Sequence, residues 1–362
     1  MKSKILTFII GILVGAIITI LVFYIYTKNT KRFPDGEMSS MMREEKGPRG
    51  DFPGKPEDEQ IEKETTAEGV EEGTIVVEKN IDLTQYSSNI TIKESGDYTL
   101  TGEFKNAVLI NAEGEVRLNL DNVTIKNEKT ATIVNQSKNS LIINLLENTT
   151  NTLSDGGSSE YDGCIYSLGA LTIEGSGELN VYGNQMEGEG IATETNDITI
   201  NGGNIKIESE DDGLNAGGDG GLITINDGNI SIKANGDGID SNKNLVINGG
   251  YIYTVGSAAG GDAGIDTDDG FMINGGTVIA LGSGMLENPE SSSKQKLACF
   301  NLNNKISKDT TISLKNENNE EILSFEANEE FKTLIVSDEK IVSGTYYLYQ
   351  DGEKTNFTAT VK

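Results

Sequence analysis

Short segments in which apolar and polar residues alternate recur along the chain from residue 74 onward. Alternation with a period of two indicates β-strands that bury one face. No segment in this region keeps a helical apolar period for more than two turns, so the sequence predicts an all-β body. The first strand signals are IVVEKNIDL, NITIKESGDYTLTGEF and VRLNLDNVTI, with turn residues between them.

The alternation becomes a repeat between residues 163 and 276. Each copy reads roughly Asp-Gly-Ile, a few polar residues, apolar-x-Ile-Asn-Gly-Gly, then apolar-x-apolar. The first aliphatic recurs at spacings of 26, 23, 25 and 26, at Ile165, Ile191, Leu214, Ile239 and Ile265. Short strands and Gly-rich turns with such a period are typical of a stacked solenoid. We predict a right-handed parallel β-helix of about 22–27 residues per coil over residues 74–284. The alternative, a β-sandwich of repetitive hairpins, does not require this register.

The same turn position is occupied by Asn in four successive repeats: Asn201, Asn226, Asn248 and Asn274. Stacked coils would let these side chains form an amide ladder, and Asn-Gly supplies the positive φ that a tight turn needs. After Gly284 the pattern changes to antiparallel hairpins. Residues 285–362 are therefore expected to form a small β element that covers the last coil and blunts its open edge.

The N-terminal region differs from the rest of the chain. Ile5 to Tyr26 is an uncharged run of 22 residues, which as a helix would span about 33 Å and cross a bilayer core. We predict a single-pass membrane anchor over residues 1–28, with a cleaved signal peptide as the alternative. Residues 29–73 are charged, rich in proline and poor in aliphatics, which predicts a disordered acidic linker. The bulk of the chain is expected outside the cell.

Composition narrows the function further. The chain has 57 Asp and Glu residues against 29 Lys and Arg, which argues against nucleic acid or anionic lipid as partners and suits divalent cations. It has no His, which excludes Ser-His and Cys-His nucleophile pairs and His-ligated zinc. Cys164 and Cys299 are too few for a disulfide scaffold. Two free thiols are the favoured interpretation, and a single bridge stays open.

Acidic residues recur at fixed offsets from the repeated aliphatic residue. Glu189, Asp212 and Asp237 stand two places before it, and Asp240 and Asp266 stand one place after it. Neighbouring coils lie about 4.8 Å apart, where two carboxylates repel by about 3.5 kcal/mol at an effective dielectric of about 20. Ca²⁺ takes oxygen ligands at about 2.4 Å, so an ion fits between coils.

We therefore predict one or more Ca²⁺ sites within residues 189–269. The candidate ligands are Glu189, Asp212, Asp237, Asp240, Asp262, Asp266 and Asp268, with Asp211, Asp219 and Asp269 as further oxygen donors nearby. The alternative is that outward acidic residues only solvate the turns.

Several stretches of the chain resemble a known family. They are GDYTLTGEF, VRLNLDNVTI, LLENTTNTLSDG, IYSLGALTIEGSGELNV, DDGLNAGGDGGLITINDGNISI, DGIDSNKNLVINGG and GIDTDDGFMINGGTVIALGSGM. The chain resembles, over about residues 75–362, clostridial and other Gram-positive surface proteins with a carbohydrate-binding domain and a polysaccharide-lyase-like right-handed β-helix. The resemblance implies binding of plant cell-wall polysaccharide, both cellulose and acidic pectin-like chains, with bound calcium and no cleavage. Asp212, Asp237, Asp240 and Asp266 match the family's acidic turn motifs.

Three functions remain to be weighed. A pectate-lyase-like enzyme needs a basic residue to remove a proton, and between residues 163 and 284 Lys243 is the one candidate base. A binding module presents aromatic faces to sugar rings, for which Tyr251 and Tyr253, two apart and expected to point outward, are the candidates. A surface stalk or adhesin would use the β-helix only as a spacer. We expect a membrane-anchored, extracellular, Ca²⁺-stabilised carbohydrate-binding protein without catalytic activity.

Overall fold

The computed structural model describes residues 73–157, 160–218, 221–283 and 292–361. The predicted anchor and all but the last residue of the predicted linker lie outside this part of the chain, as does Asp219. Within the described ranges, no helix is long and apolar enough to cross a membrane.

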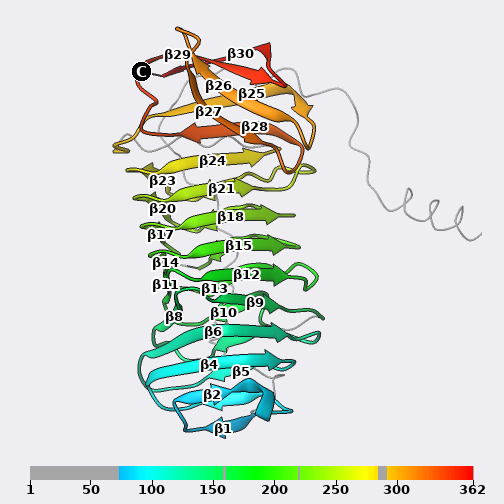
Figure 1. The fold of residues 1–362 in the computed structure, drawn as a ribbon, viewed down its shortest axis with the longest axis vertical. Coiled ribbons are helices and arrows are strands. Elements are labelled where there is room, and N and C mark those ends of the chain that lie inside the picture. The colour runs from blue at the N-terminus through cyan, green and yellow to red at the C-terminus, as the bar shows by residue number, and fades with distance from the viewer. Residues whose placement is uncertain (1–72, 158–159, 219–220, 284–291, 362) are drawn as a thin grey trace, which may run out of the picture. The chain divides into compact units, whose positions relative to one another are not determined.

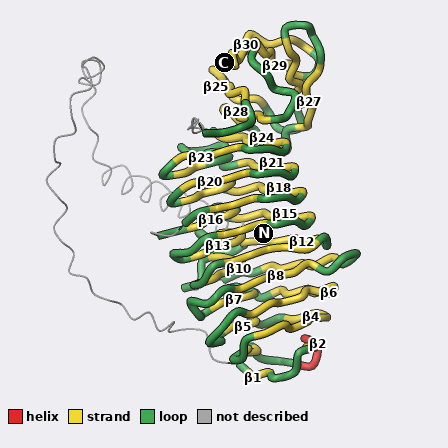
Figure 2. Tube along the Cα trace, turned by 90° about the vertical axis from the view of Figure 1, so that its left-hand side faces the viewer, coloured by secondary structure: helices red, strands yellow, loops and turns green. Residues whose placement is uncertain are grey.

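The described chain winds into a parallel β-helix whose coils stack one above another (Figures 1 and 2). The first wall is a nine-stranded parallel sheet. Its strands, in spatial order, are β1 (Thr74–Val76), β3 (Ile90–Ile92), β5 (Val108–Ile110), β7 (Ile133–Asn135), β10 (Gly163–Ser167), β13 (Glu189–Thr193), β16 (Leu214–Ala216), β19 (Ile239–Ser241) and β22 (Asp266–Thr267). The predicted all-β solenoid is thus confirmed.

The second wall belongs to a 17-stranded sheet. Its first four strands are β2 (Asn80–Asp82), β4 (Gly96–Phe104), β6 (Val116–Lys126) and β8 (Leu141–Leu145). Two parallel rows follow. One row continues from β8 through β11 (Leu171–Gly175), β14 (Ile198–Ile200), β17 (Ile223–Ile225), β20 (Asn244–Ile247) and β23 (Gly270–Ile273). The other contains β9 (Thr150–Ser154), β12 (Glu178–Gly183), β15 (Asn204–Ser209), β18 (Asn229–Ala234), β21 (Tyr251–Val255) and β24 (Thr277–Gly282).

A C-terminal β element follows the last coil. Strands β25 (Leu297–Ile306) and β28 (Phe331–Ser337) continue the second wall, with β28 antiparallel to both β24 and β25. A separate four-stranded antiparallel sheet contains β26 (Thr311–Asn316), β27 (Glu321–Glu326), β29 (Gly344–Gln350) and β30 (Glu353–Val361). The one helix in the described residues is the short 3-10 helix η1 (Leu83–Gln85) near the other end.

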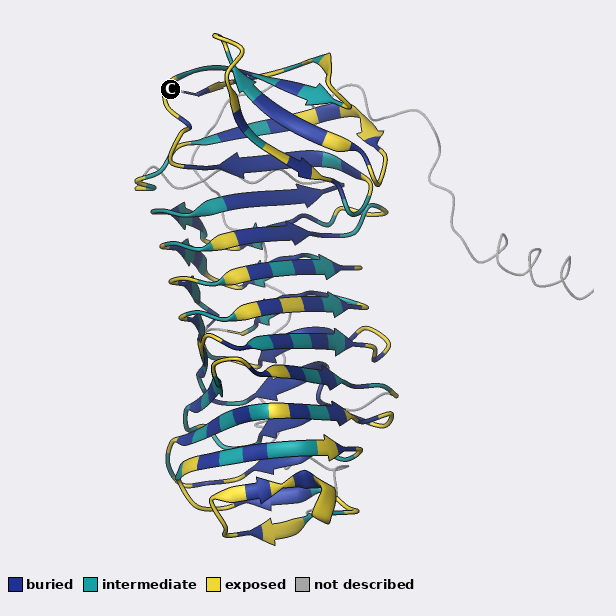
Figure 3. Cartoon of the chain, in the orientation of Figure 1, coloured by how far each residue is buried: buried dark blue, intermediate teal, exposed yellow. Residues whose placement is uncertain are grey.

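The core consists of aliphatic columns inside the coils. Burial alternates along most strands of the second wall, whereas first-wall strands such as β10 and β13 are buried at every position (Figure 3). The register aligns Ile191 with Ile165 on one side and with Leu214 on the other, and Leu214 with Ile239. All five repeated aliphatics are at most 1 % exposed. Because equivalent aliphatic side chains of successive coils stack on one another, each column is filled without gaps. The repeat itself therefore produces the core.

The glycine of the Asp-Gly-Ile motif is required by a close approach between the two walls. A Cβ on Gly190 would lie 2.3 Å from Ile207 Cγ2, and one on Gly213 would lie 2.2 Å from Ile232 Cγ2. On Gly238 it would lie 2.0 Å from Thr254 Oγ1. The first wall therefore meets the second at a corner that has no room for a side chain.

The predicted asparagine ladder is present. The side-chain amide of Asn226 donates to Oδ1 of Asn201 at 2.7 Å, that of Asn248 to Asn226 at 2.8 Å, and that of Asn274 to Asn248 at 2.9 Å. The positive φ of these turns is adopted two residues after each Asn, for example at Gly250 (φ 89°). The ladder thus links successive turns by side chains in addition to the backbone.

The last two coils are apolar on their outer face because the C-terminal element packs there. Tyr253, Val255, Ile279 and Leu281 lie in a second core with residues of the C-terminal strands. In the backbone pairing, Leu281 is opposite Leu334. The parallel stack therefore does not end in an open edge at β24. Cys164 and Cys299 are both free thiols.

We expect Gly213→Ala to lower the free energy of unfolding by about 1–3 kcal/mol, because the new methyl group overpacks the corner against Ile232. Gly261→Ala is the matched control, since a Cβ there meets nothing within 4 Å. Urea denaturation followed by circular dichroism measures both. Equal losses in the two variants would contradict the steric explanation.

Candidate metal and carbohydrate site

The strongest concentration of buried charge lies at the corner where each coil enters the first wall. Glu189 begins β13, while Asp212 and Asp237 come just before the glycines that precede β16 and β19. Glu189 is 7 % exposed and Asp212 is 9 % exposed, and Asp237 is half-buried. We call Glu189, Asp212, Asp237, Asp240 and Asp266 the acidic column.

Hydrogen bonds link the acidic column from coil to coil. Oδ1 of Asp212 accepts the backbone N–H of Asp237 at 2.7 Å, and Oδ1 of Asp237 accepts that of Ala263 at 2.5 Å. The side-chain amide of Asn215 donates to Oε1 of Glu189 at 3.3 Å and to Oδ2 of Asp212 at 3.2 Å. Each carboxylate thus reaches the next coil, as the alignment of the repeats predicts.

A second set of positions lies one residue after the inward aliphatic. The register aligns Tyr166, Ala192, Asn215, Asp240 and Asp266 in successive coils. Asp240 and Asp266 are direct partners in the parallel pairing of β19 and β22, so their Cα atoms are about 4.8 Å apart. The sequence prediction that these two carboxylates lie on neighbouring coils is confirmed.

Burial makes four carboxyl groups of the acidic column weak acids. Desolvation, followed by the charge of Asp162 and by smaller contributions from Asp212 and Asp211, raises the pKa of Glu189 to about 9. Desolvation likewise raises the pKa of Asp212 and of Asp237 to about 7. The pKa of Asp240 rises to about 6 through desolvation and then through the charges of Asp266 and Asp268. In the absence of a cation, Glu189 therefore holds a proton at neutral pH, and Asp212 and Asp237 are protonated in part.

The other predicted ligands lie at the edge of this cluster. Asp262 is half-buried and Asp268 is exposed. The charge of Asp262 raises the pKa of Asp237, and the charge of Asp268 raises that of Asp240. All seven predicted ligands therefore belong to one electrostatically coupled group.

The donor chemistry of the acidic column fits a hard cation. It offers carboxylate, amide and backbone oxygens and no nitrogen or sulfur ligand, which is the preference of Ca²⁺. Oε2 of Glu189 is buried and has no hydrogen-bond partner, an arrangement that is costly unless a proton or an ion satisfies it. Within the described residues, no three acidic side chains converge closely enough to enclose a metal ion. Backbone carbonyls, Asn215 or water would have to complete a coordination shell.

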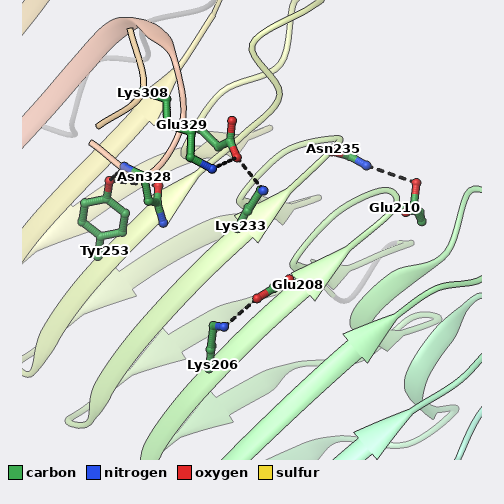
Figure 4. Close-up of polar contacts among 9 residues, drawn as sticks. All are labelled: Lys206, Glu208, Glu210, Lys233, Asn235, Tyr253, Lys308, Asn328 and Glu329. Carbon is green, nitrogen blue, oxygen red and sulfur yellow. Dashed lines mark hydrogen bonds and ion pairs between the residues drawn. The ribbon is translucent and has the colours of Figure 1, made fainter. Parts of the chain in front are cut away.

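The predicted tyrosine platform is wrong for one of its two residues, Tyr253. Tyr251 is 42 % exposed, but Tyr253 is only 7 % exposed and is covered by the C-terminal element (Figure 4). Its hydroxyl donates to Asn328 Oδ1 at 3.0 Å, and its ring lies edge-on to Phe325, with centroids 6.0 Å apart. Tyr253 therefore anchors the C-terminal element and cannot face a sugar. The sequence pattern placed it on the outer face correctly but did not indicate what covers that face.

The lysines that could act as a base are placed as follows. Lys206 forms an ion pair with Glu208 at 2.6 Å, and Lys233 forms one with Glu329 at 2.5 Å (Figure 4). Lys243 is exposed in the turn after β19, where its backbone N–H donates to Ser241 Oγ at 3.3 Å. Lys206 and Lys233 thus have carboxylate partners on the outer face of the second wall.

Two further acids, one buried and one exposed, were not singled out from the sequence. Asp155 is 5 % exposed and accepts hydrogen bonds from the Asn184 backbone and the Gln185 side chain, both at 2.6 Å. Asp162 lies close enough to raise the pKa of Glu189. Both precede the clear repeats, so their offsets gave no periodic signal.

The stability of the metal-free protein should fall as pH rises. The four acidic-column groups from Glu189 to Asp240 have pKa values of about 6–9 when folded and about 4 when unfolded, so the folded state binds more protons between these values. The stabilisation is complete below about pH 4 and is lost as pH rises through 6–9. Urea denaturation in EDTA at pH 5, 7 and 9 measures this. Glu189→Gln should flatten the profile, whereas Asp97→Asn, at an exposed carboxylate, should not.

Comparisons with known proteins identify the family of the chain. No curated protein matches the chain. A solved structure, the polysaccharide lyase-like protein from C. thermocellum in a gadolinium derivative, is 28 % identical, with a TM-score of 0.41; the alignment covers 56 % of this chain and 88 % of that one. Residues 86–342 match the carbohydrate-binding domain-containing protein family. The resemblance drawn from the sequence is confirmed, and the chain belongs to this family.

Proposed function

We propose that the chain is a non-catalytic carbohydrate-binding protein whose β-helix is stabilised by Ca²⁺ along the acidic column. Family membership over residues 86–342 supports carbohydrate binding. The observation that carries the metal is the coil-to-coil acidic column with the unpartnered Oε2 of Glu189. The polysaccharides we propose are those of the cell wall, cellulose or acidic pectin-like chains.

Calcium would also decide whether an acidic glycan can bind. The chain has a net charge of −28, so a polyuronate approaching it is repelled unless a cation bridges the two. Neutral glycans meet no such barrier. We therefore propose that binding of polygalacturonate requires Ca²⁺ and that binding of cellulose does not.

We further propose that residues 5–26 anchor the protein in the cell membrane, with the β-helix outside the cell. The uncharged run is long enough to span a bilayer, and the cell-wall polysaccharides that we propose as ligands lie outside the cell. Fractionation of cells expressing the full chain, with protease treatment of intact cells, tests this placement.

A polysaccharide lyase is the second candidate, because this activity also uses Ca²⁺ and a lysine. Lys243, exposed and three residues after Asp240, is the residue on which it depends. The ion pairs of Lys206 and Lys233 favour the non-catalytic alternative, since a paired ammonium is a poor base.

Ca²⁺ is expected to raise the melting temperature of the protein at pH 8 and to have little effect at pH 5, where protons compete for the carboxylates. Asp212→Asn combined with Asp240→Asn should remove most of the increase. A melting temperature that is the same with CaCl₂ and with EDTA at pH 8 would end the metal proposal.

Glycan binding is tested by pull-down on cellulose and on polygalacturonate, each with Ca²⁺ or EDTA. We expect cellulose binding under both conditions and polygalacturonate binding with Ca²⁺ only. Ultraviolet absorbance of unsaturated products distinguishes a binder from a lyase. Such products formed by the wild-type protein, and lost in Lys243→Ala, would establish the enzyme instead.

A further inference from the structure

A stripe of amide and hydroxyl side chains runs up the outer face of the second wall, separate from the acidic column. One register column contains Glu178, Asn204, Asn229 and Tyr251 on β12, β15, β18 and β21. The neighbouring column contains Asn180, Lys206 and Ser231 on the first three of these strands. Parallel pairing therefore repeats polar groups at the coil spacing of about 4.8 Å.

These columns line a shallow depression over three coils, which we call the amide groove. Its lining includes Glu178, Asn180, Asn204, Lys206, Asn229 and Ser231. A second depression at the far end of the same three strands is lined by residues that include Tyr182, Asn184, Asn235 and Lys233. Both depressions are shallow and polar, as a surface that contacts sugar hydroxyls should be.

The lysine charges around the amide groove are compensated within the protein. Lys206 is paired with Glu208, and Lys233 with Glu329 (Figure 4). Glu178 accepts a hydrogen bond from the Asn180 side chain at 2.8 Å. The groove therefore presents donors and acceptors without a surplus of positive charge, and the surrounding protein is strongly acidic. This charge pattern fits a neutral ligand and disfavours a polyanion.

Tyr251 limits the amide groove toward the C-terminal end. It is the one aromatic side chain classed as exposed in the part of the chain that the structure describes. Tyr253, in the next outward position of the same strand, lies under the C-terminal element. Its hydroxyl donates to the side chain of Asn328 in that element. The groove is thus open over β12, β15 and β18. It ends at the accessible ring of Tyr251, beyond which the C-terminal element covers the second wall.

We propose that the amide groove is the glycan-binding site and that it takes a neutral, β-1,4-linked hexose chain lying along the solenoid axis. The coil spacing is close to the advance of one sugar in such an extended chain, so each coil meets one sugar. The Asn and Ser side chains bond to its hydroxyls, and Tyr251 packs against a ring face. This inference rests on the proposed function and adds the place of binding and the direction in which the chain lies.

The test measures binding of cellohexaose, a soluble neutral probe, to the full chain by isothermal titration calorimetry. Tyr251→Ala should weaken binding about tenfold, the loss expected for an aromatic anchor. Ser231→Arg places a long charged side chain in the middle of the groove and should weaken binding at least as much. The melting temperature of each variant shows that it is folded.

Two control variants separate this site from the rest of the surface. Thr224→Ala changes an outward residue on β17. This strand belongs to the same coil as Ser231 but to the row of strands that runs from β8 to β23. Asp97→Asn changes an exposed carboxylate on β4, outside the groove. Both should bind cellohexaose as the wild type does, in Ca²⁺ and in EDTA.

The possible failures are distinguishable. If the wild type binds cellohexaose and both groove variants bind it equally well, the location is wrong and the proposed function stands. If the wild type binds polygalacturonate but no cellohexaose, the neutral ligand is wrong. If no glycan binds, the proposed function fails together with the inference. If Ser231→Arg instead dissociates a dimer on size exclusion, a second copy covers the groove and the inference is overturned.

Discussion

The in-register pairing of parallel strands determines which side chains of the β-helix lie next to each other. Once the strands of successive coils align, every residue lies beside its counterpart one repeat away. Aliphatics then form the core columns, asparagines form a ladder, and carboxylates are brought to within about 5 Å of one another. The first two consequences stabilise the stack. The third destabilises it unless protons or cations neutralise the charge.

The two polar features on the surface solve different physical problems. The acidic column lies at a corner where the walls converge, so its carboxyl groups are buried and their pKa values are raised. The amide groove lies on an open strand face, where side chains keep contact with water and charges are paired locally. One repeat therefore produces both a largely buried acidic row suited to an ion and an exposed row of mainly amide and hydroxyl groups suited to sugar hydroxyls.

Much of this architecture could be predicted from the sequence because the repeat determines the register. Ile165, Ile191, Leu214 and Ile239 were placed on one inward column, and Asp240 beside Asp266, from spacing alone. Local periodicity could not indicate what packs on the outside of the coils. Tyr253 follows the outward pattern, yet it contacts Asn328, which is 75 residues away. Asp155 lies before the regular repeats, so its burial depends on contacts that no spacing shows.

The C-terminal element also bears on how the chain is made. Each coil needs only the one before it as a template, so the stack can grow in the order in which a ribosome synthesises it. Strand β28, which covers β24, is among the last segments to emerge. Until then the growing stack ends in unpaired backbone groups and the exposed apolar faces of Tyr253, Val255, Ile279 and Leu281. A truncated chain without residues 292–361 would keep this adhesive surface, so premature termination favours self-association.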